Sequence, residues 1–402
     1  MKHRALFVLL LLAVSTVDAR ASNSTPPPDR CGGSSAYTIP VDGAPFAVVA
    51  TPDAQHLFVS LNSSNPRQVN GLAILACGGG RYRRQSFLPL ENQPTGMALT
   101  HAGDLLVVAD DTDVAFVDVN RALSGKGDPL LGFFEDLPGD DGGAVYANIS
   151  PDDRFAFVSE EQSGTITVID LMKARSNHFS STSVVGEIQL GHAPVALVFS
   201  KDGRHLFTTV QVAPDAFGFQ KTCKTEGAPA AEAKDESPGA LIVIDVPTAE
   251  TDPAHAVISK VPAACHPVRA ALAPDGDALW VTARASNMVL KFSTARLIAG
   301  DAQANLAQVP VGAAPVPVIV TSDGKYVLSG NSDRFAQGPP QNQDLDVIDA
   351  QSAAVVGHIR VGKFPRELSR SRSGATIFLS NFLSNSITVI EASAIPQVMT
   401  RQ

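Results

Sequence analysis

The sequence predicts an all-β protein, a seven-bladed β-propeller of four-stranded antiparallel blades. Three observations lead to this prediction. Residues 142–171 (GGAVYANISPDDRFAFVSEEQSGTITVIDL) read as three short strands separated by residues that tight turns prefer. The turn in the middle of this unit has seven copies along the chain. The copies follow one another at about fifty residues, except for one step of 73 residues, and a period of roughly 40–50 residues is typical of propeller blades.

The seven turns share a pattern in which runs of β-branched and aromatic residues flank the turn residues. In chain order they are Pro52-Asp53-Ala54, Ala102-Gly103-Asp104, Pro151-Asp152-Asp153, Lys201-Asp202-Gly203, Pro274-Asp275-Gly276, Ser322-Asp323-Gly324 and Ser373-Gly374-Ala375. A proline stands about eight residues before six of the turns, at positions 45, 94, 194, 267, 315 and 365, and Ala144 replaces it in the third copy. After each turn, a later strand ends on residues such as Val168-Ile169-Asp170.

These anchors resemble the YVTN-type β-propeller repeat family. Its repeat has a Gly-x-x-Pro start, a Pro-Asp-Gly turn, a VTN-like second strand and a VSVID-like third strand. The resemblance covers residues 37–395 and implies the propeller fold. It implies little about activity, because unrelated functions share this fold.

The N-terminal residues predict export. Lys2, His3 and Arg4 precede an apolar run from Ala5 to Val14, and residues 19–21 offer a small-residue cleavage site. We therefore expect a signal peptide over residues 1–21, a disordered tail over 22–35 and a single propeller domain over 36–402, in a secreted or periplasmic protein. The apolar run is shorter than a membrane span needs, and no later segment qualifies, so no membrane span is predicted.

Ring closure is predicted from the number of strands at the two ends. Residues 36–41 read as a lone strand before the first repeat, and the seventh repeat ends after its third strand at Glu391. An N-terminal strand that completes the last blade would leave no open sheet edge.

Composition excludes some partners. The formal net charge is −9, with no basic cluster, which argues against nucleic acid and anionic membranes. Only 18% of residues are charged and 44% are hydrophobic, which is enough for one large core. No motif indicates a cofactor, and we expect a monomer.

The four cysteines predict two disulfides in an exported protein. Cys31 lies just before the closing strand, and Cys77 lies at the end of the first blade's third strand, so we expect them to pair. Cys223 and Cys265 should pair at the opposite end of the ring. Cys223 belongs to an insertion at residues 211–239, which separates the second and third strands of blade four. No Cys-x-x-Cys spacing supports a metal site or haem attachment.

The candidate site is a departure from the repeat on the first strands, which line the channel. Tyr146, Arg269 and Glu367 stand where other copies have small residues such as Ala47 or Ala196. The functional interpretation is a polar pocket with acid–base and anion-binding groups. Its catalytic candidates are Arg269, Glu367, His192, His266 and Glu160, and its ligand-binding candidates are Tyr146, Arg284, Asn331 and Arg334. The alternative is that Arg269 and Glu367 only satisfy each other while the rim charges are solvated.

Two functions of different classes follow. The first is a non-enzymatic scaffold that binds a protein, a glycan or a small molecule at the rim of the central channel. The resemblance implies it, since such repeats occur in cell-surface and periplasmic proteins. The second is a lactonase or lactonising enzyme, because similar seven-bladed propellers act on lactones through rim His, Arg and Glu residues.

Overall fold

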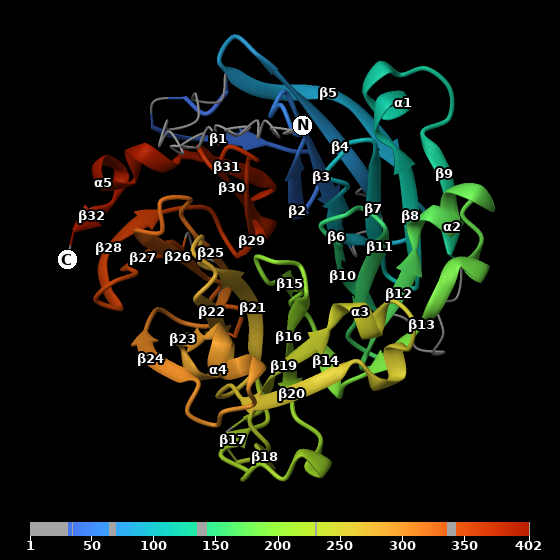
Figure 1. The fold of residues 1–402 in the computed structure, drawn as a ribbon. Helices are drawn as coiled ribbons and strands as arrows, with labels where there is room; N and C mark the ends of the chain where they lie inside the picture. The colour runs from blue at the N-terminus through green and yellow to red at the C-terminus, as the bar shows by residue number, and fades with distance from the viewer. Residues whose placement is uncertain are drawn as a thin grey trace, which may run out of the picture.

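The computed structural model describes residues 31–33, 35–63, 70–134, 143–229, 231–335 and 343–401. Its strands form eight sheets, seven of which are arranged as blades around a central channel (Figure 1). The prediction of a seven-bladed propeller is confirmed. The proposed leader at residues 1–21 and most of the predicted tail lie outside the described residues.

The blades follow one another along the chain, and each runs from an inner first strand to an outer fourth strand. Blade one contains β2 (Pro45–Ala50), β3 (His56–Leu61), β4 (Gly71–Gly78) and β5 (Arg81–Pro89). Blade two contains β6 (Pro94–Leu99), β7 (Leu105–Asp110), β8 (Asp113–Asp118) and β9 (Leu130–Phe134). Blade three contains β10 (Ala144–Ile149), β11 (Phe155–Glu160), β12 (Thr165–Asp170) and β13 (Val184–Gln189). Blade four contains β14 (His192–Pro194), β15 (Val198–Phe199), β16 (His205–Val212), β19 (Ala240–Asp245) and β20 (Val257–Pro262).

The remaining blades complete the ring. Blade five contains β21 (Pro267–Leu272), β22 (Ala278–Ala283), β23 (Met288–Ser293) and β24 (Asn305–Pro310). Blade six contains β25 (Pro315–Val320), β26 (Tyr326–Asn331), β27 (Asp344–Asp349) and β28 (Ala354–Arg360), with β32 (Thr400–Arg401) added at its outer edge. Blade seven contains β29 (Pro365–Arg370), β30 (Thr376–Asn381), β31 (Ser386–Glu391) and β1 (Ala36–Pro40).

The N-terminal strand closes the ring, as the sequence predicted. Strand β1 pairs antiparallel with β31, from Ala36 opposite Ile390 to Pro40 opposite Ser386. The first and last blades therefore lie side by side, blue beside red in Figure 1.

The repeated turn is built from its own side chains. In the third copy, Ser150 Oγ donates to Asp152 Oδ1 over 2.6 Å, and the same carboxylate oxygen accepts from the backbone N–H of Arg154. The next residue, Asp153, has a φ of 61°, the left-handed conformation that glycine adopts in five other copies. The turn therefore depends on local residues, which is why it can be recognised in the sequence.

Short helices follow four of the third strands. They are α1 (Val119–Ser124), α2 (Leu171–Ser176), α3 (Val246–Ala249) and α4 (Thr294–Ile298). The last residue of the strand is the N-cap in each case, and Asp170 accepts from the backbone N–H of Lys173. The Val-Ile-Asp ending thus stops one element and starts the next. A fifth helix, α5 (Ile395–Val398), precedes β32.

Second-strand hydroxyl groups join the inner strands of neighbouring blades. Thr282 Oγ1 in β22 accepts from the backbone N–H of Arg269 (3.1 Å) and donates to the carbonyl of Val316 in blade six (2.9 Å). Ser380 Oγ likewise accepts from the backbone N–H of Glu367 and donates to the carbonyl of Phe46. The corresponding residues elsewhere are Ser60, Ser159 and Thr209. These bonds fix the inner strands, from which the site is built.

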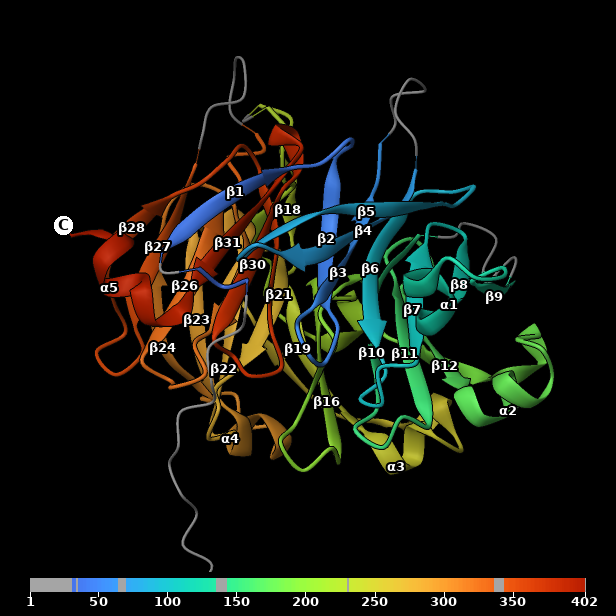
Figure 2. The same ribbon diagram turned by 90° about the horizontal axis from the view of Figure 1, so that it is seen from above.

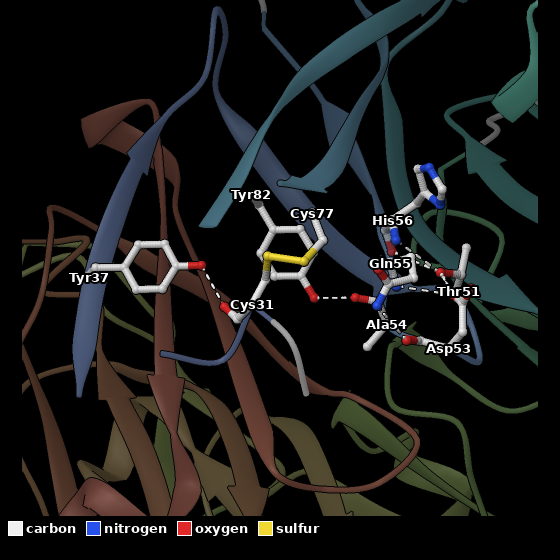
Figure 3. Close-up of a disulfide and its surroundings, with 9 residues drawn as sticks. All are labelled: Cys31, Tyr37, Thr51, Asp53, Ala54, Gln55, His56, Cys77 and Tyr82. Atoms are coloured by element: carbon white, nitrogen blue, oxygen red, sulfur yellow. Dashed lines mark hydrogen bonds between the residues drawn. A yellow bond between two sulfur atoms is a disulfide. The ribbon is translucent and has the colours of Figure 1, made fainter. Parts of the chain in front are cut away.

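Both predicted disulfides are present. Cys31–Cys77 ties the segment before β1 to the end of β4, and the hydroxyl of Tyr37 donates to the carbonyl of Cys31 beside it (Figure 3). Cys223–Cys265 ties the segment between β16 and β19 to the loop before blade five. That segment also holds a two-stranded sheet of β17 (Cys223–Lys224) and β18 (Asp235–Glu236).

Seen from the side, the disc has two faces (Figure 2). Strand β18 lies on the face at the top of Figure 2, which we call the upper face, and α3 and α4 lie at the bottom, on the lower face. No helix in the described ranges is both long and apolar enough to cross a membrane.

Candidate functional site

Tyr146, Arg269 and Glu367 meet inside the channel. The hydroxyl of Tyr146 donates to Glu367 Oε1 over 3.0 Å, and Arg269 Nε donates to Glu367 Oε2 over 2.9 Å. The guanidinium of Arg269 also lies 4.7 Å from the centre of the Tyr146 ring. Three blades that are distant in sequence thus contribute one compact group, which we call the channel triad.

The hydroxyl bonds between blades position this triad. Arg269 and Glu367 each donate their backbone N–H to a second-strand hydroxyl, from Thr282 and Ser380 respectively. The ring of Tyr146 fits because its neighbour in blade two is Gly96, where a Cβ would lie 2.6 Å from a Tyr146 ring carbon. The large residue in one blade therefore depends on the missing side chain in the next.

Burial sets the electrostatics of the triad. Arg269 is 4% exposed and Glu367 is 6% exposed. Burial, followed by the charge of Glu367, raises the pKa of Tyr146, so its hydroxyl stays protonated and remains a hydrogen-bond donor. The two terminal nitrogens of Arg269 are buried and have no hydrogen-bond partner among the described residues. Four of the five N–H donors of this guanidinium therefore have no partner among the described residues.

A cavity of about 330 Å³ opens at the upper end of the channel, and we call it the upper mouth. Its lining residues come from five blades and their loops. They are Glu161, Gln162, His192, Ala193, Gln211, Arg284, Arg334 and Arg366. Three guanidinium groups thus face one cavity whose lining includes a single carboxylate.

Arg366 is the arginine of this set that sequence analysis missed. It follows Pro365 in β29, at a position where other copies have residues such as Val195, Val268 and Val316. Its guanidinium lies 4.1 Å from the centre of the Phe46 ring, and no carboxylate is within ion-pair distance among the described residues. Burial and the charge of Arg269 lower the pKa of Arg366 to about 9. The same comparison of copies that found Glu367 could have found Arg366 one position earlier.

Arg284 is already paired. Its Nε donates to Glu226 Oε1 over 2.7 Å, a terminal nitrogen also bonds Glu226, and the same nitrogen donates to Gln211 Oε1 over 2.8 Å. Glu226 belongs to the segment between β16 and β19, which has no counterpart in other blades. This segment therefore contributes directly to the rim, although nothing in its composition singled out Glu226.

Arg334 is less fully satisfied. It lies 5.2 Å from the centre of the Phe335 ring, and no ion pair joins it to a described carboxylate. Burial, followed by the charge of Arg284, lowers its pKa. Arg334 and Arg366 are thus the two cations of the upper mouth that remain without a direct counter-ion.

The two candidate histidines have different surroundings. His266 is buried between Glu226, at 3.5 Å, and Glu236, at 3.3 Å. Burial lowers its pKa, although both carboxylates oppose that effect. His192 is exposed and lines the upper mouth.

Two other candidates are engaged within their own blades. Glu160 accepts hydrogen bonds from Ser163, Thr165 and Thr167, and none of its hydrogen bonds involves a histidine. Asn331 donates to Asp346 Oδ2 over 3.0 Å inside blade six. The structure therefore brings neither residue to the upper mouth. Within the described ranges, no group of three His, Cys, Asp or Glu side chains is arranged to hold a metal ion.

Comparison with known proteins supports the fold alone. No protein-family model matches this chain, and no curated protein matches it. Among solved structures, it is similar to hydrazine synthase from Kuenenia stuttgartiensis, with a TM-score of 0.63 and 18% identity over 87% of this chain and 96% of that chain. As many as 1480 chains of solved structures match, which is expected for a fold that carries many functions.

Proposed function

We propose that this protein is an exported propeller of the YVTN-repeat type that binds a small anionic ligand at the upper mouth. The observation that carries the proposal is the meeting of Arg284, Arg334 and Arg366 on one cavity, where only Arg284 has a direct carboxylate partner. A guanidinium presents a planar set of donors that matches a carboxylate or phosphate.

The dimensions and burial of the site support a small ligand. A cavity of about 330 Å³ is at the lower end of the range that small-molecule sites occupy. Glu161, which lines the same cavity, already accepts from Gln211 Nε2 over 3.1 Å. Burial, followed by repulsion from other arginines, lowers the pKa of Arg334 and Arg366, and an acidic ligand would offset that repulsion. A neutral glycan would not reduce the repulsion between these arginines.

Export is part of the proposal. The apolar leader pattern supports it, and so do the two disulfides, because such bonds persist in oxidising compartments.

Calorimetric titration with sugar acids, dicarboxylates and phosphate esters, beside the matching neutral sugars, tests the ligand class. We expect acidic compounds to bind, and we expect Arg366→Gln and Arg334→Gln each to weaken binding by roughly tenfold or more, because each removes a charged hydrogen-bond donor. Arg296→Gln, at an exposed position of helix α4, is the matched control and should change nothing. Neutral sugars that bind as well as their acids would contradict the proposal.

A lactonase is the second candidate, and one observation favours it. His192 lines the same cavity as the three arginines, so a proton acceptor and an anion clamp face one space. Hydrolysis of a panel of sugar and carboxylated lactones tests it, with His192→Ala, Arg269→Ala and Glu367→Ala beside the parent. Turnover that disappears in the His192 variant while its melting temperature is unchanged would favour the enzyme. Binding without turnover would favour the scaffold.

A further inference from the structure

The lower end of the channel holds a second cavity, separate from the upper mouth. It has a volume of about 660 Å³, and we call it the lower mouth. The turns that join first to second strands surround it, and Tyr146 of the channel triad forms part of its lining. An adjoining cavity of about 330 Å³ shares five lining residues with it.

Most residues that line the lower mouth have apolar side chains, and polar side chains lie among them. Inner strands of several blades contribute Ile149, Leu197, Phe199, Leu272, Val318 and Leu368. Phe199 and Leu272 are partly exposed there. Apolar side chains that gather in a concave site, rather than singly on the surface, usually mark a binding site.

The amide side chain of Asn148 in this wall bonds to neighbouring backbone groups. In blade four the inner strand is interrupted between β14 and β15, and the carbonyl of Leu197 accepts from Asn148 Nδ2 of blade three over 2.8 Å. Asn148 Oδ1 accepts from the backbone N–H of Ile149. The carbonyl of Leu197 and the side chain of Asn148 are therefore bonded to each other at the interruption.

The charges at the lower mouth have one sign. The lining of the two joined cavities includes Lys201, Arg370, Arg372 and His101, and none of the described lining residues is an aspartate or glutamate. Arg370 donates to the carbonyl of Val320, and Arg372 donates to the carbonyl of His101, so neither contact neutralises a charge. In a chain with a net charge of −9, this concentration of cations is unusual.

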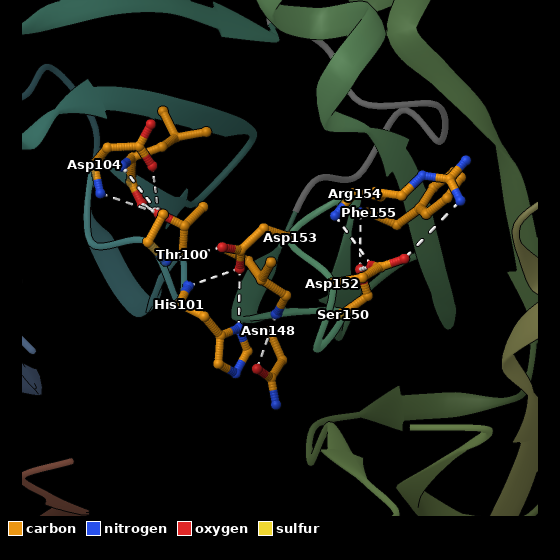
Figure 4. A network of polar contacts seen from close by, with 12 residues as sticks. Thr100, His101, Asp104, Asn148, Ser150, Asp152, Asp153, Arg154 and Phe155 are labelled. Carbon is orange, nitrogen blue, oxygen red and sulfur yellow. Dashed lines mark hydrogen bonds and ion pairs between the residues drawn. The ribbon is translucent and has the colours of Figure 1, made fainter. Parts of the chain in front are cut away.

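Nearby acidic residues accept hydrogen bonds from residues of the turns. Asp202 accepts from Ser200 and from the backbone N–H of Arg204 within its own turn. Asp153 accepts from the backbone and the ring of His101 (Figure 4), so the histidine has a counter-charge while Lys201 and Arg370 have none among the described residues. Two cations thus remain available beside an apolar wall.

We propose that the lower mouth binds a small amphipathic carboxylate, whose aliphatic chain lies on the inner-strand wall and whose carboxylate contacts Arg370 and Lys201. The apolar wall and the uncompensated cations are complementary to the two parts of such a ligand. This proposal does not depend on the ligand of the upper mouth.

Calorimetric titration of the purified protein with hexanoate, octanoate and decanoate, at concentrations at which they are monomeric, tests the proposal. Affinity should rise by about fourfold per methylene, because each one leaves water for the apolar wall. Octylamine, which has the same chain and the opposite charge, should not bind. An amine that binds as well as octanoate would overturn the proposal. So would binding to phosphatidylglycerol vesicles without binding to monomeric octanoate.

Variants locate the site. Lys201→Glu, an exposed position, should weaken octanoate binding by tenfold or more, whereas the control Lys126→Glu, at an exposed lysine that lines neither mouth, should not. Arg370→Gln should also weaken binding, and Arg370→Lys should restore most of it. Arg334→Gln should leave octanoate binding unchanged. Loss of binding in the Arg334 variant, or no loss in the Lys201 variant, would place the carboxylate elsewhere and overturn the proposal.

Discussion

At the scale of single residues, Asp110 shows what happens when one partner of a repeated contact is missing. It ends the second strand of blade two, where Glu160 and Asn381 stand in other blades. Glu160 bonds Thr167, and Asn381 bonds Thr388, but the corresponding third-strand residue in blade two is Ala115. Asp110 is 0% exposed, and both of its oxygens lack a partner among the described residues.

Burial, followed by the charges of Asp113 and Asp111, raises the pKa of Asp110 from 3.8 to about 7. The folded protein thus holds this proton more tightly than the unfolded chain does. The contribution of this proton to the free energy of unfolding is fully present below pH 4 and is lost as the pH rises towards 7. The largest loss is about 4 kcal/mol. Asp110→Asn should therefore raise the melting temperature by a few degrees at pH 8 and change it little at pH 4.

Thermal melts at the two pH values, with the exposed Asp277→Asn as a control, measure this difference. An equal shift of the Asp110 variant at both pH values would show that its effect is packing rather than ionisation.

At the scale of elements, the segment between β16 and β19 is attached to the disc at a few points. Cys223–Cys265 holds it covalently, and Glu226 holds it to Arg284, while Lys221, Lys224 and Lys234 are exposed along it. The sequence predicted an insertion at residues 211–239 that contains Cys223. It did not predict that Glu226 would neutralise Arg284, because an insertion has no repeat copies with which to compare it.

The double variant Cys223→Ser, Cys265→Ser should open this segment before the propeller unfolds. The expected result of limited trypsin digestion is cleavage at these exposed lysines well below the global melting temperature, with the disc otherwise intact. Mass spectrometry of the fragments identifies the cleavage sites, and the parent protein is the control. Fragments from all blades at once would mean that the bond supports the whole fold.

At the scale of the whole molecule, the fold could be predicted because its information is local and repeated. The turn of Ser150 and Asp152 and the helix cap of Asp170 are each specified within a few residues. Because the turn has seven copies in the sequence, seven blades could be predicted. The candidate site could be predicted only where it interrupts that repeat, as at Glu367. The contacts that build the site join residues far apart, such as Tyr146 and Glu367 at a separation of 221, and depend on the closed ring.

Ring closure can be tested one backbone bond at a time. The backbone N–H of Val41 donates to the carbonyl of Asn385, and the backbone N–H of Glu391 donates to the carbonyl of Ser35. In an antiparallel ladder every second residue is hydrogen-bonded to the partner strand, so residues 37 and 39 are donors in β1. The N–H of Thr38 therefore points away from β31. Ile39→Pro should lower the melting temperature strongly, since it removes a closing bond, whereas Thr38→Pro should be tolerated at this outer edge.

Thermal melts of both proline variants measure the difference, and Ile39→Ala accounts for the lost buried side chain. Equal losses from the two prolines would mean that β1 contributes through its side chains rather than through its ladder.

The Cys31–Cys77 bond also determines how the protein responds to mechanical force. Strand β1 and strand β31 are antiparallel, so Ala36 and Ile390 lie at the same end of their ladder, and a pull on the two termini would peel the strands apart bond by bond. The disulfide changes the path of that force. Tension on the chain before Cys31 passes through Cys77 into the first blade and bypasses β1 altogether, so a load at the N-terminal end would leave the closing strand slack.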